Sequence, residues 1–411
     1  MLKNGYGEGI PALRLEIQEH GGHGLERSTR IFKIVQFSFY ILQLVDIHKY
    51  PFKSVQSVSS LPDRQAGVFY CIRIEDASKQ SAKKQFIQKT NNMETAPNYK
   101  TNTAAFRGNW IEYIYQLQEN ICQALEAVDG KAHFIEDNWE RAEGRGGGGK
   151  TRVISNGNVF EKGGVNTSVV YGHVKEKMKQ HLQVEGAAKW FAAGLSLVLH
   201  PLNPYVPTVH ANWRYFELYD ADDNVYDRWF GGGTDLTPFY LFEEDAKHFH
   251  QTIKNTMDNF GEDLYPAYKK RCDEYFVNSH RNNETRGIGG VFYDHLRPEN
   301  DDDAEKLRQF QEANGNAFLT GYLPIVQKRK DLLFGEREKH WQEIRRGRYT
   351  EFNLLHDRGT LFGLKTNGRT ESILMSLPPT VRFEYNYQPE PGSEEDKLLQ
   401  VCLQPKEWVN V

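Results

Sequence analysis

LVLHPLNPYVPTVHANWRYFE, residues 197–217, is the stretch from which the fold is easiest to infer. Its three prolines exclude a helix, because proline lacks a backbone N–H and its ring clashes with the preceding turn. The chain is therefore expected to run extended from His200 to His210. Beyond that point, strand spacing places Trp213 on one face and His210, Asn212 and Arg214 on the other.

The second of these faces combines an imidazole, an amide and a guanidinium, which together bind anions and move protons. A hydrophobic core would not contain such a set. The same residue types also build purely structural hydrogen-bond networks on strands. Two interpretations therefore follow from the residues alone, a functional site and a structural network.

Strand-like runs and helical runs surround this stretch. The strand-like runs arrive as hairpins, which favours an antiparallel sheet; they cover residues 152–168, 195–200, 210–230, 289–294, 348–357, 360–366 and 372–377. Residues 110–130, 244–261 and 302–331 have helical patterns, the first with Ile111, Ile114, Leu117, Ile121 and Leu125 on one face. The acidic run at residues 299–305 is typical of a solvated helix start. We predict an α+β fold, a large, mainly antiparallel sheet with helices on both faces.

The chain divides into an N-terminal extension, residues 1–92, and a catalytic domain, residues 93–411. The extension is rich in loops, then apolar, then rich in Ser, Gln and Lys, and we expect it to be poorly ordered. Its apolar run at residues 31–45 is too short and too interrupted for a membrane span, so a buried or partner-packed segment is expected. A targeting region, an accessory segment and untranslated sequence all fit the extension, since Met93 is a plausible start.

Composition narrows the class of protein. The net charge of −4 and the pI of about 6.4 argue against a nucleic acid or an anionic membrane as partner. The four cysteines are scattered without a C-x-x-C pair, so a zinc ribbon, a redox pair and a disulfide framework are not expected. A reducing compartment follows, and we predict a cytoplasmic protein.

One motif suggests a nucleotide, and its context argues against it. GRGGGGKT, residues 144–151, fits the phosphate-loop pattern at every position. That loop needs a buried strand before it and a helix after it. Residues 133–143 are charged and helix-like, and residues 152–168 predict a hairpin with its turn at Asn156-Gly157. We therefore do not expect nucleotide binding there.

FGGGTDLTPFY, residues 230–240, contains a single charged residue, Asp235. A carboxylate in such a segment is either the N-cap of a following helix or an acid or base in a site. Thr237, before Pro238, is the better cap candidate. Asp235 is therefore predicted to be catalytic.

Arginines and histidines complete the candidate groups. An arginine fork suits carboxylates, and six arginines lie in glycine-rich or strand-like segments: Arg152, Arg214, Arg281, Arg286, Arg369 and Arg382. A hairpin turn at Asn367-Gly368 is predicted to present Arg369. The histidines show no metal-ligand spacing, so the residues alone give only weak support for a metal.

Four long motifs together resemble the oxygen-dependent coproporphyrinogen-III oxidases, from near Trp110 to Val409. They are SLVLHPLNPYVPTVHANWRYFE, WFGGGTDLTPFYLFEEDAKHFH, HRNNETRGIGGVFYD and RGRYTEFNLLHDRGTLFGLKTNGRTESILMSLPP. The glycine-rich segment at residues 139–166 also resembles the family. Two positions depart from the family pattern: Arg271 stands where Trp is usual, and Asn367 where Gly is frequent.

The resemblance implies a homodimer, with residues near 349–384 at its interface. It also implies oxidative decarboxylation of two propionates of coproporphyrinogen III to vinyl groups. Molecular oxygen is then the oxidant, no organic cofactor takes part, and protoporphyrinogen IX, carbon dioxide and hydrogen peroxide are the products. Substrate carboxylates would explain the arginines.

Site residues follow from the resemblance by motif. Ser196, Asn212, Trp213, Arg214, Asn367, Gly368 and Arg369 are expected to bind substrate, together with Arg281 and Arg286. His210 matches the proton donor, and Asp235 matches the carboxylate that faces the pyrrole N–H groups. A divalent metal is implied for bacterial members by His200, His210, His250 and His280, although the family is generally described as needing none. A non-haem metal oxygenase and a non-catalytic tetrapyrrole-binding protein are the alternative functions.

Overall fold

The computed structural model describes residues 103–141, 146–365 and 368–410. The predicted extension, with its apolar run at residues 31–45, lies outside these ranges. Within them, no helix combines the length and the apolar character needed to span a bilayer.

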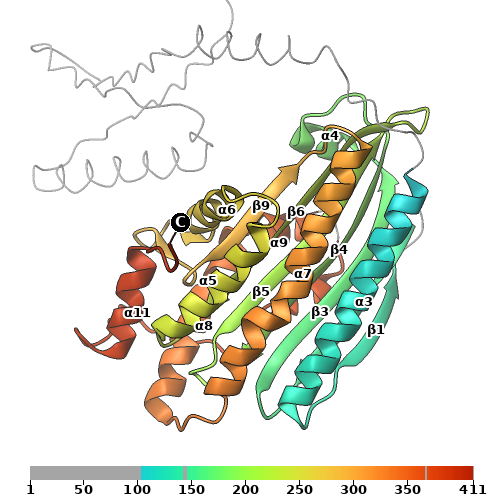
Figure 1. The fold of residues 1–411 in the computed structure, drawn as a ribbon. Helices are drawn as coiled ribbons and strands as arrows, with labels where there is room; N and C mark the ends of the chain where they lie inside the picture. Colours follow the sequence, from blue (N-terminus) through green and yellow to red (C-terminus); the bar gives the residue numbers. More distant parts are fainter. Residues whose placement is uncertain (1–102, 142–145, 366–367, 411) are drawn as a thin grey trace, which may run out of the picture. The chain divides into compact units, whose positions relative to one another are not determined.

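A seven-stranded antiparallel sheet organises the fold (Figure 1). Its spatial order is β1 (Ile135–Glu140), β2 (Gly146–Ser155), β3 (Phe160–His173), β4 (Lys189–Pro201), β5 (Thr208–Tyr219), β6 (Val225–Thr237) and β9 (Gly290–Leu296). A separate two-stranded ribbon pairs β7 (Val277–Asn278) with β8 (Glu284–Thr285). The sheet and its helices confirm the α+β prediction.

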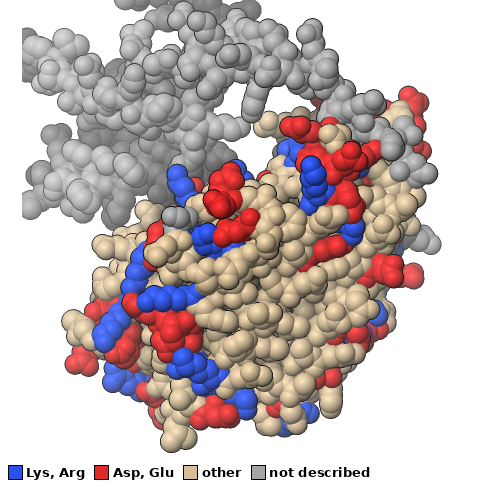
Figure 2. Space-filling model, in the orientation of Figure 1, with Lys and Arg blue, Asp and Glu red and all other residues tan. Residues whose placement is uncertain are grey.

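Two long helices, α3 (Ala104–Asp129) and α7 (Asp301–Arg329), lie across one face of the sheet (Figure 1). The Trp110 indole of α3 donates to the carbonyl of Ala193, 3.0 Å away, and Phe318 of α7 packs edge-on against Trp213. Further along this side are α5 (Glu243–Met257), which packs against α7, and α6 (Leu264–Tyr275), which packs against β9. On this side, acidic and basic side chains gather toward the edges, and other residues make up a broad area in the middle (Figure 2).

The helices predicted from periodicity are confirmed. Helix α3 ends at Gly130, which adopts a left-handed φ of 70° and donates to the carbonyl of Glu126. Four of its five predicted face residues are buried, and Ile111 is half-buried. The acidic run begins α7, where the Asn300 side chain accepts from the backbone N–H of Asp303.

Three predicted strands are wrong. Residues 348–355 lie in α8 (Glu336–Leu355), residues 360–365 in α9 (Arg358–Lys365) and residues 372–374 in α10 (Thr370–Leu374), which is followed by a turn. Buried side chains in α8 recur at three- and four-residue spacing from Trp341 through Ile344 and Arg348 to Phe352. This helical pattern starts before residue 348, so residues 348–357 alone do not reveal it.

The helix-like prediction for residues 133–143 is also wrong, because β1 occupies most of this segment. Its charged residues reflect an edge strand with both faces largely exposed to water. The next element confirms the predicted hairpin: β2 and β3 pair in register, and Asn156 takes a left-handed φ of 57° in the turn.

The same strands exclude a phosphate loop. Residues 146–151 lie inside β2, which is paired with β1 on one side and β3 on the other. Their backbone therefore belongs to a sheet and does not form a concave loop before a helix. The ammonium of Lys150 lies 3.2 Å from the Glu136 carboxylate.

Candidate functional site

The sheet face that points away from α3 and α7 is built from small and polar residues. The register aligns Ser168, Gly194, Arg214 and Gly231 in one cross-strand row, and Asn166, Ser196, Asn212 and Gly233 in the next. Strand alternation puts all eight on the same side. We call them the small-residue face: Asn166, Ser168, Gly194, Ser196, Asn212, Arg214, Gly231 and Gly233.

The glycines leave room for Arg214. A Cβ on Gly194 would lie 3.0 Å from the Arg214 Cβ, and one on Gly231 would lie 2.7 Å from its Nε. Without these carbons, the guanidinium lies along the sheet, donates to Asn212 Oδ1 at 3.3 Å and pairs with Asp294 at 3.1 Å. The Arg214 side chain is 41% exposed, so it is accessible to a ligand.

Aromatic rings follow at one end of the small-residue face. Phe216 and Trp229 are opposite each other in β5 and β6, two positions beyond Arg214 and Gly231. Their rings stack with centroids 4.4 Å apart, and Trp190 stacks on Phe216 at 6.0 Å. Trp229 is 6% exposed and His295 stacks on it, so these rings form a small hydrophobic cluster that closes this end of the face.

Titratable groups meet at the other end. His210 and Asp235 are direct partners in the register of β5 and β6, and His210 Nδ1 lies 2.7 Å from Asp235 Oδ1. One guanidinium nitrogen of Arg286 donates to both Asp235 oxygens, at 2.8 and 2.7 Å. We call these three residues the His210–Asp235–Arg286 cluster.

The ion pair in this cluster is almost completely buried. Burial alone would raise the pKa of Asp235, but the Arg286 charge and the hydrogen bond with His210 hold it below its usual value. Burial acts against the Arg286 cation, yet Asp235 outweighs it and raises the pKa of the guanidinium. Both side chains are therefore ionised at neutral pH, and together they carry no net charge.

Asp235 is not a helix cap. It lies within β6, as does Thr237, and α5 begins only at Glu243 with Phe242 as its N-cap. The prediction that Thr237 caps a helix is wrong, because β6 continues through that residue. Excluding the cap leaves Asp235 in the cluster.

Two predicted substrate residues lie elsewhere. Trp213 belongs to the face covered by the helices, where it is 1% exposed and packs against Phe318. A single-residue step along a strand reverses the side-chain direction, which separates Trp213 from its two neighbours in the motif. Arg281 forms a forked ion pair with Glu351 of α8.

The turn predicted at Asn367-Gly368 lies partly outside the described residues, because these end at 365 and resume at 368. On either side of this gap the chain forms the helices α9 and α10, and Arg369 is the N-cap of α10. The Arg369 guanidinium donates to Ser372 Oγ at 3.0 Å and also pairs with Asp137 of β1. Ser372 in turn lies 2.9 Å from Thr151 Oγ1, and its carbonyl accepts from Asn166 at 3.0 Å, so α10 borders the small-residue face.

Two of the four histidines expected to bind a metal are buried and already paired with protein groups. His200 contacts Thr208 Oγ1 at 3.2 Å and the carbonyl of Ser376 at 2.8 Å. His250 contacts the Tyr265 hydroxyl at 2.8 Å and a backbone carbonyl at 3.2 Å. Burial lowers the pKa of both imidazoles to about 3, so both are neutral.

The remaining two histidines also have protein partners. His280 lies 2.8 Å from His356 and 3.1 Å from Glu351, whereas His210 contacts Asp235. Among the described residues, no group of three or more His, Cys, Asp or Glu side chains is arranged to hold a metal ion. The four histidines therefore do not fit a shared metal, which would need their nitrogens about 2.0–2.1 Å from one ion.

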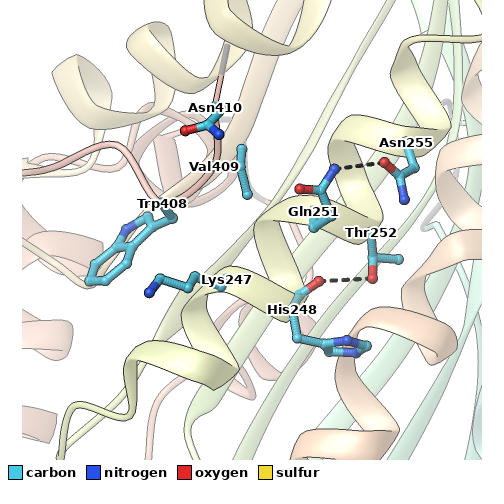
Figure 3. A pocket seen from close by; sticks show the side chains of 8 residues that line it. All are labelled: Lys247, His248, Gln251, Thr252, Asn255, Trp408, Val409 and Asn410. Atoms are coloured by element: carbon cyan, nitrogen blue, oxygen red, sulfur yellow. Dashed lines mark hydrogen bonds between the residues drawn. The ribbon is translucent and has the colours of Figure 1, made fainter.

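A separate cavity of about 550 Å³ lies between α5 and the C-terminal segment (Figure 3). It is lined by Lys247, His248, Gln251, Thr252, Asn255, Trp408, Val409 and Asn410. Gln251 bonds Asn255, and the Thr252 hydroxyl bonds the carbonyl of His248, so these polar groups serve the helix itself. The cavity shares no residue with the cluster or the small-residue face, and it lacks the paired acid and base of the cluster.

Sequence reasoning missed several partners of the cluster. The Arg286 guanidinium donates to Asn353 at 3.0 Å and lies over the rings of Phe276, Tyr349 and Phe352, 4.1, 4.7 and 5.0 Å from their centroids. No local signal connects Arg286 with these residues, because Phe276 follows α6 and the other three belong to α8, which begins 50 residues after Arg286. Asp294 could be predicted from the sequence. Side chains alternate along β9, so Asp294 lies on the same side of the sheet as Gly290, the residue opposite Asp235.

Comparisons with known proteins agree with this picture. Residues 109–408 match the family described as Coproporphyrinogen III oxidase. The chain is 51% identical over 316 residues to the oxygen-dependent coproporphyrinogen-III oxidase, chloroplastic, of Glycine max, an alignment covering 75% of this chain and 80% of the relative. It is 50% identical over 319 residues to coproporphyrinogen-III oxidase 1, chloroplastic, of Arabidopsis thaliana, covering 75% and 81%.

A match across almost the whole described part of the chain, with half of the aligned residues identical, leaves no doubt about ancestry, and the chain belongs to the oxygen-dependent coproporphyrinogen-III oxidases.

Proposed function

We propose that the small-residue face binds coproporphyrinogen III and that the His210–Asp235–Arg286 cluster supplies the proton chemistry. As a member of its family, the protein catalyses the oxidative decarboxylation of two propionates to vinyl groups, with O2 as the oxidant, in tetrapyrrole biosynthesis. The product is protoporphyrinogen IX.

The balance of this reaction states what the site must do. For each propionate, the bond to the carboxylate carbon breaks and releases CO2, and a hydrogen leaves the neighbouring carbon as the vinyl group forms. O2 accepts the two electrons and, with one further proton taken up, becomes hydrogen peroxide. The site must therefore hold an anionic, flat molecule, admit oxygen and handle a proton.

The exposed position of the Arg214 guanidinium is the single observation that carries the proposal of a substrate site on the small-residue face. This guanidinium is partly exposed above Gly194 and Gly231, and His210 of the His210–Asp235–Arg286 cluster lies four residues earlier on the same strand. Arg214 has five N–H donors, so a substrate carboxylate can bind in addition to, or in place of, Asp294. At roughly 3.3 Å per residue, His210 and Arg214 are about 13 Å apart along β5, which is the scale of a tetrapyrrole.

The test combines turnover with a binding variant. Aerobic reactions should yield protoporphyrinogen IX from coproporphyrinogen III, and anaerobic reactions should not. Arg214→Ala should raise KM by about 10- to 100-fold, because a hydrogen bond to a charged group contributes about 1.5–3 kcal/mol. Arg308→Ala is the matched control, since Arg308 is a paired arginine on α7. A folded Arg214→Ala protein with unchanged KM would refute the substrate site.

Oxygen is the co-substrate of the oxygen-dependent relatives, and we propose that no organic cofactor and no metal takes part here. The contacts of the four histidines with other protein groups, described above, support the proposal that no metal takes part. The competing function, a non-haem metal oxygenase, predicts loss of activity after treatment with a chelator and recovery with a divalent metal. Our proposal predicts unchanged turnover.

We also propose a homodimer that uses residues near 349–384. Large apolar side chains are exposed in and beside this segment, among them Leu355 and Phe383 at 58% each. Exposed apolar side chains in a cluster favour a protein interface. Sedimentation should give the mass of two chains, and Leu355→Glu combined with Phe383→Glu should give one.

Two further proposals concern the N-terminal extension and the location of the protein in the cell. We propose that a protein beginning at Met93 keeps full activity, because the family match starts at residue 109. The cytoplasm is the predicted location, whereas the names of both plant relatives carry the word chloroplastic. Imaging of fluorescent fusions with and without residues 1–92 separates the two compartments.

A further inference from the structure

The contact between His210 and Asp235 fixes which imidazole nitrogen carries a proton. An ionised carboxylate only accepts hydrogen bonds, so the 2.7 Å contact with Asp235 Oδ1 requires a proton on His210 Nδ1. Arg286 also approaches Nδ1, but at 3.4 Å. The shorter contact therefore decides the tautomer, and a neutral His210 has its lone pair on Nε2.

Asp235 has no direct access to a ligand on the small-residue face. Its side chain is 3% exposed. Oδ1 contacts both His210 and Arg286, and Oδ2 contacts Arg286. A pyrrole N–H would have to displace one of these partners to reach the carboxylate.

Arg286 is equally enclosed. Its side chain is 2% exposed, one guanidinium nitrogen serves Asp235 and another serves Asn353. Phe276, Tyr349 and Phe352 surround the guanidinium with their rings. A propionate could reach it only by separating a buried ion pair, which is costly because each charge would lose its partner.

The second imidazole nitrogen points the other way. His210 Nε2 lies 3.4 Å from the Asn212 amide nitrogen, and Asn212 Oδ1 accepts from Arg214. The His210 side chain is 17% exposed, more than either of its partners. Nε2 is therefore the atom of the cluster that borders the small-residue face.

From these contacts we infer that Asp235 and Arg286 are positioning residues, which hold His210 with its proton on Nδ1 so that Nε2 faces the substrate. This inference rests on the proposed substrate face. It differs from the expectation that Asp235 meets the pyrrole N–H groups and that Arg286 binds a carboxylate. His210 is then the residue of the cluster that touches the substrate.

The first test uses no substrate, so it is independent of the proposed function. ¹⁵N NMR of histidine-labelled protein at pH 9 reports the proton position, and His210→Gln identifies the signal. We expect a proton on Nδ1 and none on Nε2. In Asp235→Asn, the new amide can donate to Nδ1, so the proton should move to Nε2. A wild-type protein with its proton on Nε2 would overturn the inference.

The second test separates positioning from binding. Coproporphyrin III, the oxidised and unreactive form with the same four carboxylates, is titrated by fluorescence. Asp235→Asn and Arg286→Lys should bind it within about threefold of wild type while kcat falls by about 10²–10⁴-fold, the range for lost acid–base catalysis. Arg214→Ala should weaken binding at least about tenfold. Arg286→Lys with a binding loss equal to that of Arg214→Ala would overturn the role given to Arg286.

One further variant guards against misfolding. Asp235→Asn leaves a buried cation unpaired, which destabilises a fold strongly. The double variant Asp235→Asn with Arg286→Gln removes both charges together, so it should fold, bind coproporphyrin III and still show the low kcat. Wild-type kcat in the folded double variant would contradict the inference. Failure of wild-type protein to bind coproporphyrin III would instead refute the substrate face and leave the NMR result standing.

Discussion

The two faces of one sheet differ sharply in chemistry. On β5, Trp213 and Tyr215 point toward the helices and are at most 1% exposed, whereas Asn212 and Arg214 point to the other side and remain accessible. The backbone is shared, and only alternation separates the two sets. Neighbouring residues of a single motif therefore serve different purposes, and proximity in sequence says little about a shared role.

The difference also separates stability from activity. Large aromatic side chains fill the helix-covered face, so substitutions there should mainly change the free energy of unfolding. The other face is open and polar, so its substitutions should change kinetic constants. The following substitutions and conditions test this division.

The largest effect is expected at His210. His210→Gln removes the imidazole and leaves the buried pair of Asp235 and Arg286 intact. We expect kcat to fall by about 10²–10⁴-fold, because the acid–base group is lost, while the melting temperature changes little. Steady-state kinetics and calorimetry check the two parts, and a large loss of stability at unchanged kcat would contradict the division between the faces.

Trp213→Ala tests the opposite face. Truncating a fully buried indole costs about 3–5 kcal/mol, which urea unfolding measures. The kcat of the folded fraction should stay within a few-fold of wild type, although Asn212 and Arg214 are adjacent in sequence. Trp213→Phe is the control and should lose less stability. A substrate-binding tryptophan would instead raise KM in both variants.

Acid should destabilise the protein through two buried imidazoles. His200 and His250 have folded-state pKa values lowered to about 3 from 6.5. Between these values the unfolded chain binds more protons, so stability is present above pH 6.5 and falls as the pH decreases below it. Each histidine should cost about 2 kcal/mol between pH 7 and pH 5. Urea midpoints at both pH values measure the loss, and His250→Gln should reduce it; an unchanged slope would show that this imidazole is not the cause.

The smallest effect is expected at Lys150, which belongs neither to the small-residue face nor to the His210–Asp235–Arg286 cluster. Its ion pair with Glu136 is partly exposed, and such pairs contribute about 0–1 kcal/mol. Lys150→Ala should therefore keep wild-type kcat and nearly wild-type stability. A nucleotide-dependent activity that disappears in this variant would revive the phosphate-loop interpretation.

The sequence predicted the parts of the fold that have a regular period over a long range. The hairpin of β5 and β6 is an example, because the polar turn at residues 220–224 separates two strand-like runs. The turn alone does not predict which residues are opposite each other, because a bulge between Leu218 and Tyr219 shifts the pairing by one residue and so brings His210 opposite Asp235. Arg286 was not predictable either, since it reaches Asp235 from beyond two helices and a two-stranded ribbon.

The C-terminal helices show the other limit. The strand prediction for residues 348–357 rested on a short aromatic run, whereas the helical spacing of α8 becomes visible only from Trp341 onward. Phe352 and Asn353 of that helix complete the surroundings of Arg286. A site assembled from distant elements needs tertiary structure, and the local pattern gave only the groups on β5 and β6.

The strand order has a consequence for folding kinetics. From β1 to β6 every strand pairs with its neighbour in the chain. In contrast, α5, α6 and the two-stranded ribbon separate β9 from its partner β6 in the sequence. Pairings between distant segments form more slowly, because a longer loop must be closed first. Asp235 is opposite Gly290 of β9, and Arg286 lies four residues before Gly290 in the chain. Arg286 should therefore reach Asp235 in one of the last steps of folding, and catalytic activity during refolding should appear after most of the sheet has formed.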